Sequence, residues 1–217
     1  YELVIQMQLT DKDIDRYSRN IILPEIGGVG QYKLLQSKVL VVGMGGLGSP
    51  LLMYLAAAGI GNITIIDDDN VELSNLQRQV IHNTNNIGKP KVDSAKSFIH
   101  KINPEINITK INSRIDTQNI QELIKAQDIV ADGSDNFKTR FLVADTCYKL
   151  KKTLISAAIT KYEGQISTWK NYKNLPCYRC LFANEPNENN INNCSSNGVL
   201  GSIGGVFGSL QATEVIK

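Results

Sequence analysis

The stretch from residue 38 to residue 59 constrains the fold of this chain more than any other part of its sequence. It begins with the continuous apolar run KVLVVG (38–43), which is typical of a strand buried on both faces. The glycine-rich turn GMGGLG follows, and the pattern GLGSPLLMYLAAAG then predicts a helix that ends near Gly59. A strand, a glycine turn and a helix in this order are typical of domains that bind NAD and also of some that bind ATP.

Strands and helices alternate along the rest of the chain. Strand patterns occupy NITIID (62–67), INITKIN (106–112), DIVAD (128–132), TLISAAI (153–159) and GQISTWK (164–170). Helix patterns occupy KVDSAKSFIHKI after Pro90, TQNIQELIKA with Thr117 as its N-cap, about 136–150, and GVFGSLQATEVIK at the end. We therefore expect an α/β fold: a Rossmann-like, doubly wound and mostly parallel sheet with helices on both faces and extra antiparallel C-terminal strands. Ligands of such sheets bind at the carboxyl ends of the strands.

The glycine loop predicts a ligand that carries phosphate. Gly43, Gly45 and Gly48 occupy the positions of a G-x-G-x-x-G motif, and Gly46 is an additional glycine. Bare backbone lets phosphate approach, and the following helix offers free N–H groups to an anion. Asp67 ends the next strand, where a carboxylate can accept the hydroxyls of a ribose. The structural alternative is a turn that is glycine-rich only because it packs tightly.

Charged residues after the later strands favour ATP over NAD. Arg78 and Lys91 can neutralise phosphates beyond the first, and Asp135 lies where a carboxylate can hold Mg²⁺. A dehydrogenase would also need a proton donor, and neither His82 nor His100 has a visible catalytic partner. Each of these charges, taken singly, could equally be a solvated or salt-bridged surface residue.

Length and composition fit a single domain over residues 1–217. Hydrophobic residues make up 42% of the chain and charged residues 20%, and the net charge of +2 argues against a nucleic-acid or membrane surface as a partner. The sequence has no apolar run of membrane-spanning length and no signal-peptide pattern, so we expect a cytoplasmic protein. Its start at Tyr1 is consistent with a missing upstream piece.

Seven motifs occur in one order along nearly the whole chain. They are RYSRNIIL, GMGGLGSP, DDDNVELSNLQRQVIH, IGKPKVDSA, DGSDNFKTR, CYRC and GSLQATEVIK. In these motifs the chain resembles the ubiquitin-activating-enzyme-like family, and within it the bacterial ThiF/MoeB/HesA adenylyltransferases. The resemblance implies a homodimer that uses ATP and Mg²⁺ to adenylylate the C-terminal Gly-Gly carboxylate of a ubiquitin-like sulfur-carrier protein of the ThiS/MoaD type.

The resemblance also implies roles for individual residues. Phosphate contacts fall on Gly43, Gly45, Gly46, Gly48, Asn75, Arg78 and Lys91, and the ribose contact falls on Asp67. Asp135 acts through Mg²⁺ with Asn136 beside it, and Arg19 is supplied by the partner subunit. The cations Arg19 and Arg78 stabilise the charge that moves onto the leaving pyrophosphate. We expect Arg140 to order its loop rather than to touch ATP.

The cysteines carry two further expectations. Cys177 and Cys180, in CYRC, resemble half of the family's structural zinc site, whose second C-x-x-C pair usually lies nearer the C-terminus. This sequence reaches Lys217 without that pair, so we favour a truncated C-terminus over a protein that lacks the site. If the site is lacking, Cys177 and Cys180 would be free thiols packed in the fold. Cys194 matches a cysteine that handles sulfur on the carrier in ThiF-like members, and the alternative is an idle exposed thiol.

Other functions stay open beside the main hypothesis. A sister enzyme would keep the ATP site and act on a modified tRNA base, and a binding module would hold nucleotide and carrier without chemistry. The product pathway, thiamine or molybdopterin biosynthesis, depends on the carrier, and Cys194 favours thiamine.

Overall fold

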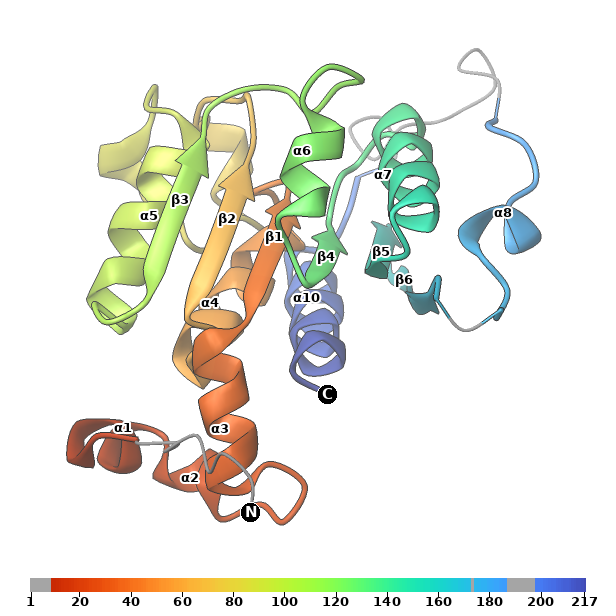
Figure 1. Ribbon diagram of the computed structural model, residues 1–217. Coiled ribbons are helices and arrows are strands. Elements are labelled where there is room, and N and C mark those ends of the chain that lie inside the picture. Colours follow the sequence, from red (N-terminus) through yellow and green to blue (C-terminus); the bar gives the residue numbers. More distant parts are fainter. Residues whose placement is uncertain (1–8, 173, 187–197) are drawn as a thin grey trace.

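The computed structural model of the chain describes residues 9–172, 174–186 and 198–217 (Figure 1). Its centre is a six-stranded sheet in the order β3-β2-β1-β4-β5-β6. The strands are β1 (Lys38–Val42), β2 (Asn62–Ile66), β3 (Asn107–Ile111), β4 (Ile129–Asp132), β5 (Thr153–Thr160) and β6 (Glu163–Lys170). All neighbours pair in parallel except β5 and β6, which are antiparallel. The predicted Rossmann-like, mostly parallel sheet is confirmed, and its antiparallel addition is the single strand β6.

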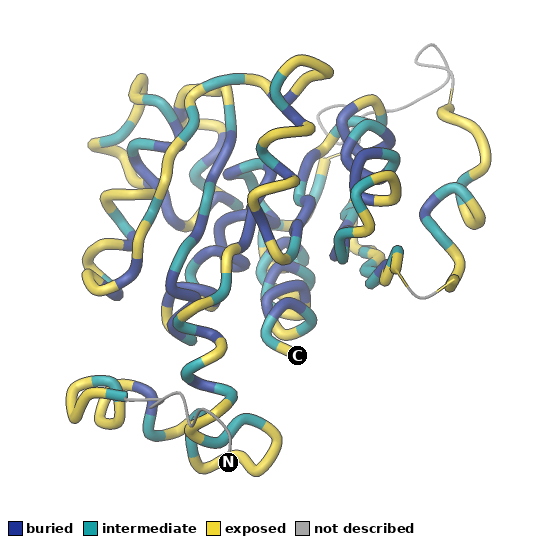
Figure 2. The backbone as a smooth tube through the Cα atoms, viewed as in Figure 1, coloured by how far each residue is buried: buried dark blue, intermediate teal, exposed yellow. Residues whose placement is uncertain are grey.

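Helices cover both faces of the sheet, as predicted. One core packs against α4 (Gly48–Ala58), α5 (Lys91–Ile102) and α10 (Gly201–Ile216). The other packs against α6 (Ile120–Lys125), α7 (Phe137–Lys149) and the short α8 (Tyr178–Leu181). The apolar run of β1 divides between the two, because side chains alternate along a strand: Val39 and Val41 enter the first core, and Leu40 and Val42 enter the second. The dark central strands in Figure 2 reflect this two-sided burial.

Three N-terminal helices precede the sheet: α1 (Asp11–Arg16), α2 (Ser18–Ile21) and α3 (Gly27–Gln36). They lie beyond the amino ends of the strands, at the bottom of Figure 1. The buried Tyr17 anchors them, because its hydroxyl accepts a hydrogen bond of 2.8 Å from Asn103 Nδ2 and its ring lies against Gly59. Gly59 ends α4 in the left-handed conformation, with φ of +83°. Within the described ranges, no helix is long and apolar enough to cross a bilayer.

One predicted helix start is wrong. The sequence pattern placed the N-cap of the helix before β4 at Thr117, but α6 begins at Ile120 and Thr117 lies in the preceding turn. Asp116 is the reason, since its Oδ1 accepts the N–H groups of Gln118 at 2.8 Å and Asn119 at 3.1 Å. An aspartate that bonds the backbone two residues on stabilises a turn, and the helix starts only after it. The short 3₁₀ segments Leu73–Asn75 and Thr84–Asn86 lie between β2 and α5.

Candidate functional site

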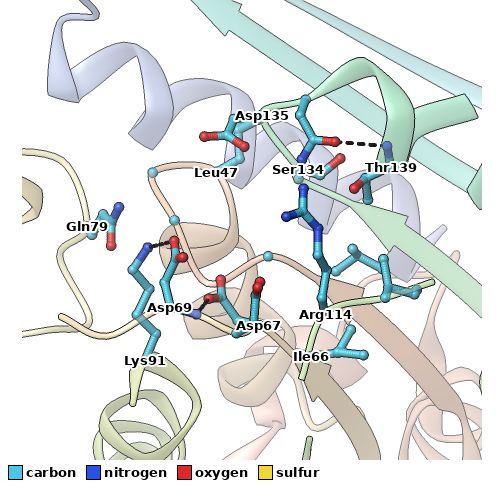
Figure 3. Close-up of a pocket in the computed structure, with 18 of the residues that line it drawn as sticks. Leu47, Ile66, Asp67, Asp69, Gln79, Lys91, Arg114, Ser134, Asp135 and Thr139 are labelled. Carbon is cyan, nitrogen blue, oxygen red and sulfur yellow. Dashed lines mark hydrogen bonds and ion pairs between the residues drawn. The ribbon is translucent and has the colours of Figure 1, made fainter. Parts of the chain in front are cut away.

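A cavity of about 350 Å³ lies at the carboxyl ends of the strands (Figure 3). Its walls come from the ends of β1 and β2, from the loops after β1, β2, β3 and β4, and from the first turns of α5 and α7. In the sheet, β1 lies between β2 and β4, so the strand order reverses beside it. Crevices at such a reversal are where open α/β sheets bind ligands.

The glycine loop between β1 and α4 presents bare backbone to this cavity. Gly43, Gly45 and Gly46 line it, and Gly43 has φ of +87°, a conformation that side chains disfavour. Gly48 does not line the cavity but is needed beneath it, because a Cβ there would lie 1.9 Å from the carbonyl oxygen of Gly43. The glycines therefore allow the loop to close tightly onto the start of α4.

Asp67 joins the end of β2 to the glycine loop. Its Oδ2 accepts the N–H of Met44 at 2.7 Å, and its Oδ1 accepts the N–H of Asp69 at 2.8 Å. Burial raises the pKa of Asp67 above the ordinary value, while the Met44 N–H and the charge of Lys91 act in the opposite direction. Each carboxylate oxygen can accept further hydrogen bonds, so a ligand hydroxyl can still bind here.

Two of the predicted cations line the same cavity. Lys91 is the first residue of α5, and its buried ammonium lies 2.7 Å from Asp69 Oδ2. Arg78 packs its side-chain stem near Gly46 and donates from Nη1 to the carbonyl oxygen of Ser74 at 3.1 Å. Arg78 therefore reaches the glycine loop, and Lys91 reaches the acidic segment that follows β2.

Sequence reasoning missed a third cation, Arg114. It follows β3 and lines the cavity, and Figure 3 shows it on the side away from Lys91 and Gln79. Among the described residues, its side chain has no hydrogen-bond or ion-pair partner. Its place just after a strand was the signal that could have found it.

The loop after β4 brings Asp135 to the cavity (Figure 3). The carboxylate is exposed and, within the part of the chain that the structure describes, has no hydrogen-bond or ion-pair partner. The neighbouring Ser134 is held on both sides of its backbone: its N–H donates to Asp132 Oδ1 at 2.9 Å, and its carbonyl oxygen accepts from Arg140 Nη2. This contact agrees with the expectation that Arg140 orders the loop.

Two asparagines from the predicted set have structural partners. Asn75 does not line the cavity, and its buried side chain accepts the N–H of Glu72 at 3.0 Å. Asn136 does line it, but its Oδ1 accepts the N–H of Thr139 at 2.9 Å as the N-cap of α7. Their roles as nucleotide contacts stay predictions.

Of the remaining predicted residues that the structure describes, Arg19 and both histidines do not line this cavity. Arg19 is exposed on α2, at the other end of the molecule from the carboxyl ends of the strands (Figure 1). Cys194 lies outside the described residues. His82 is buried behind the glycine loop, with Ser94 Oγ 2.8 Å from Nδ1 and the carbonyl oxygen of Met44 3.0 Å from Nε2. His100 is exposed on α5.

Cys177 and Cys180 form a turn beside α7. Their Sγ atoms lie 3.5 Å apart, and the N–H of Cys177 points to Cys180 Sγ at 3.4 Å. Zinc–sulfur bonds of about 2.3 Å in a tetrahedral site place two sulfurs about 3.8 Å apart, so the pair fits half of such a site. Among the described residues, no third cysteine, histidine or carboxylate lies close enough to join the pair in holding a metal ion. A group of three such side chains occurs elsewhere in the described part of the chain, at Asp67, Asp68 and Asp69.

The strand order and the polar cavity over a glycine loop define a Rossmann-like α/β domain. More particularly, the chain belongs to the ThiF family, which it matches over residues 17–217. Several curated relatives in this family are named adenylyltransferases, so the family is one of enzymes of that class.

Curated relatives match nearly the whole chain. The "SAMP-activating enzyme E1" of Haloferax volcanii is 45% identical, over 97% of this chain and 77% of the relative. The "Adenylyltransferase and sulfurtransferase MOCS3" of Culex quinquefasciatus is 47% identical, over 97% of this chain and 48% of the relative. The "Probable molybdopterin-synthase adenylyltransferase" of Porphyra purpurea is 48% identical, over 95% of this chain and 54% of the relative. The chain thus spans only about half the length of most of these relatives.

Solved structures share the fold. The structure of Escherichia coli MccB with ATP matches with a TM-score of 0.80 and 26% identity, over 93% of this chain and 62% of that chain. The structure of PaaA matches with a TM-score of 0.79 at 23% identity, over 96% of this chain and 66% of that chain, which supports the fold alone.

Proposed function

We propose that this chain catalyses the ATP-dependent adenylylation of the C-terminal Gly-Gly carboxylate of a ubiquitin-like sulfur-carrier protein. A carboxylate oxygen attacks the α-phosphorus of ATP, the bond to the β-phosphate oxygen breaks, and pyrophosphate leaves as the acyl adenylate forms. One observation carries the proposal: Arg78, Lys91 and Asp135, whose carboxylate has no partner among the described residues, line the same cavity over a glycine loop. Membership of the ThiF family, with relatives named adenylyltransferases, supports it.

The charges around the cavity favour a triphosphate over NAD. Lys91 and Arg78 line the same cavity as the glycine loop, and a triphosphate concentrates far more negative charge there than a pyrophosphate bridge does. Hydride transfer would need a proton donor at the cavity, but both ring nitrogens of His82 already have protein partners and His100 is on the outer surface. The solved complex of the related MccB with ATP also supports ATP over NAD as the ligand.

Catalysis by these residues rests on positioning and charge. Lys91 is held at a fixed place by burial and by Asp69, whose own side chain is 65% exposed and can yield to phosphate. Arg78 offers a planar fork for two phosphate oxygens, which suits the charge that grows on the leaving pyrophosphate. The exposed carboxylate of Asp135 fits a Mg²⁺ ligand, and the ion would neutralise the polyphosphate when bound.

The proposed enzyme works as a homodimer in which each site is completed by Arg19 of the other subunit. In one chain, Arg19 sits on α2 beyond the amino ends of the strands, so it lies apart from the cavity of its own subunit. It is exposed, which leaves its guanidinium available to a second copy.

Zinc and the carrier remain part of the proposal. The 3.5 Å spacing of the Cys177 and Cys180 sulfurs supports half of a structural zinc site. Cys194 is proposed to attack the carbonyl carbon of the acyl adenylate as a thiolate, so that a thioester to the carrier forms and AMP leaves. The carrier decides between thiamine and molybdopterin biosynthesis, and the relative named a molybdopterin-synthase adenylyltransferase favours molybdopterin.

Intact-mass spectrometry tests the function directly. The protein is mixed with ATP, Mg²⁺ and either a ThiS-like or a MoaD-like carrier, and each carrier is compared with a version that lacks its last glycine. We expect AMP on one intact carrier and on neither shortened one. Binding of ATP without an AMP adduct on any carrier would replace the proposal with a binding module, and AMP on a tRNA base would replace it with the sister reaction.

A further inference from the structure

The last helix, α10, packs directly against the glycine loop of the cavity. A Cβ at Gly204 would lie 2.8 Å from the carbonyl oxygen of Gly46, and one at Gly208 would lie 2.5 Å from the carbonyl oxygen of Leu47. Both distances are shorter than a Cβ tolerates, so the two glycines allow the helix to come this close. The helix that carries the motif GSLQATEVIK therefore lies directly behind the glycine loop.

Gln211, in that motif, is fully buried, and its side-chain amide joins two strands of the sheet. Its Nε2 donates to the carbonyl oxygen of Asp132 at 2.9 Å and to that of Ile155 at 3.0 Å. Asp132 is the last residue of β4, and Ile155 belongs to β5, with which β4 pairs. A primary amide carries two N–H donors, so this one side chain can hold both carbonyl oxygens.

Asp132 passes this restraint on to the loop that carries Asp135. Its carbonyl oxygen is held by the glutamine, and its Oδ1 accepts the N–H of Ser134 at 2.9 Å. The N–H of Gly133 donates to the carbonyl oxygen of Val42, the last residue of β1, at 3.0 Å. The peptide group between Asp132 and Gly133 is thus held on both sides, and Asp135 follows two residues later.

We propose that Gln211 is a positioning residue: by holding the carboxyl end of β4 against β5 and α10, it sets the course of the loop that presents Asp135 to the cavity. The inference rests on the proposed function for its consequence at Mg²⁺. Without the two amide donors, two buried carbonyl oxygens lose a hydrogen bond, and the end of β4 can shift toward other donors. Groups that hold a metal ligand in place change the affinity for the metal without touching it.

The variant Gln211→Met isolates the two donors, because methionine is an unbranched side chain of similar length with no N–H group. Its matched control is Gln127→Met, which makes the same change at a buried glutamine just before β4, at the opposite end of that strand. The Nε2 of Gln127 lies 3.4 Å from Thr64 Oγ1, away from the cavity. A general effect of removing a buried amide would therefore appear in both variants, and an effect on the Asp135 loop only in Gln211→Met.

Two measurements that require no turnover test the inference. Calorimetric titration compares the affinity for ATP in the presence of Mg²⁺ with that in the presence of a chelator, and the ratio gives the gain that Mg²⁺ provides. We expect this gain to fall by roughly tenfold in Gln211→Met and to stay as in the wild type in Gln127→Met. Hydrogen exchange without any ligand should be faster in residues 133–136 of Gln211→Met, because their backbone is held less firmly.

A wild-type gain from Mg²⁺ in Gln211→Met, or wild-type exchange in residues 133–136, would overturn the inference. If Gln211→Met does not fold, Gln211→Glu decides by the same two measurements: it keeps the shape, and burial favours its protonated form, which has one donor instead of two. Failure of the proposed function looks different. The wild-type protein would then form no AMP adduct with any carrier, while hydrogen exchange would still show whether Gln211 holds the loop.

Discussion

His82 and Met44 are joined by a hydrogen bond of 3.0 Å between the imidazole Nε2 and the main-chain carbonyl oxygen. The N–H of Met44 donates to Asp67 at 2.7 Å, so side chains hold both polar groups of this glycine-loop residue. Ser94 Oγ, on α5, lies 2.8 Å from the other ring nitrogen. A neutral ring protonated on Nε2 satisfies both contacts, since it donates to Met44 and accepts from Ser94.

Stability should therefore fall in mild acid through His82. Burial lowers its pKa below the ordinary value and Lys91 adds to this, although the Met44 carbonyl opposes it. The unfolded chain takes up this proton near pH 6.5 and the folded chain only at lower pH, so the stabilisation is complete above pH 6.5 and is lost below it. We expect this residue to contribute a slope of up to about 1.4 kcal/mol per pH unit to the free energy of unfolding as the pH falls below 6.5.

Urea unfolding at several pH values measures that slope. His82→Gln should flatten it, whereas His100→Gln, at an exposed position of α5, should leave it as in the wild type. Equal slopes in the wild type and His82→Gln would contradict the assignment.

Gly48→Ala should destabilise the domain by more than about 3 kcal/mol, because its Cβ would overlap the backbone of Gly43. Gly205→Ala is the matched control on α10. Apart from its chain neighbours and its own helix backbone, no described atom would lie within 4 Å of the new Cβ, so a gain of about 0.5–1 kcal/mol in helix propensity is expected. Thermal or urea unfolding compares the two, and equal stability would refute the tight closure of the glycine loop.

Lys91→Met should raise the KM for ATP by at least roughly tenfold, because a cation is removed from a phosphate site. Its partner Asp69 is 65% exposed and can be solvated, so stability should change by less than about 1 kcal/mol. Lys89→Met, at an exposed position two residues earlier, serves as the control. An unchanged KM for ATP in Lys91→Met would remove this residue from the proposed phosphate site.

The sequence was sufficient for much of the fold because buried parallel strands leave a strong local signal. The run at 38–43 and the β-branched run at 62–67 differ from β1 and β2 by a residue. The predicted start of α6 was wrong because a helix capped by Thr117 competes with the turn that Asp116 stabilises. The helix propensities of single residues do not decide such a competition. The strand order follows from pairing between distant segments, which periodicity does not encode.

The candidate site was partly predictable for a related reason. Asp67, Arg78, Lys91 and Asp135 follow strands, and strands of one parallel sheet end at one edge, so these residues meet at the cavity. Asn75 does not, because its side chain turns back to cap a 3₁₀ segment, and no sequence pattern sets that direction.

Arg19→Ala and Arg78→Ala should complement each other. Each variant alone should have little activity, but an equal mixture that exchanges subunits should recover about one quarter of wild-type activity, because half of the dimers are mixed and one of their two sites is intact. Pyrophosphate exchange over time measures the recovery. The unmixed Arg19→Ala and Arg78→Ala preparations are the controls. A mixture no more active than its components would argue against an arginine supplied by the second subunit.

The exchange of labelled pyrophosphate into ATP tests the central claim most directly, because it occurs only if ATP is split reversibly between its α- and β-phosphates. With a carrier that ends in Gly-Gly, we predict exchange by the wild-type protein, none with a carrier lacking the last glycine, and at least a roughly hundredfold loss in Asp135→Asn. Undiminished exchange by Asp135→Asn, or none by the wild-type protein with any Gly-Gly carrier, would contradict the account.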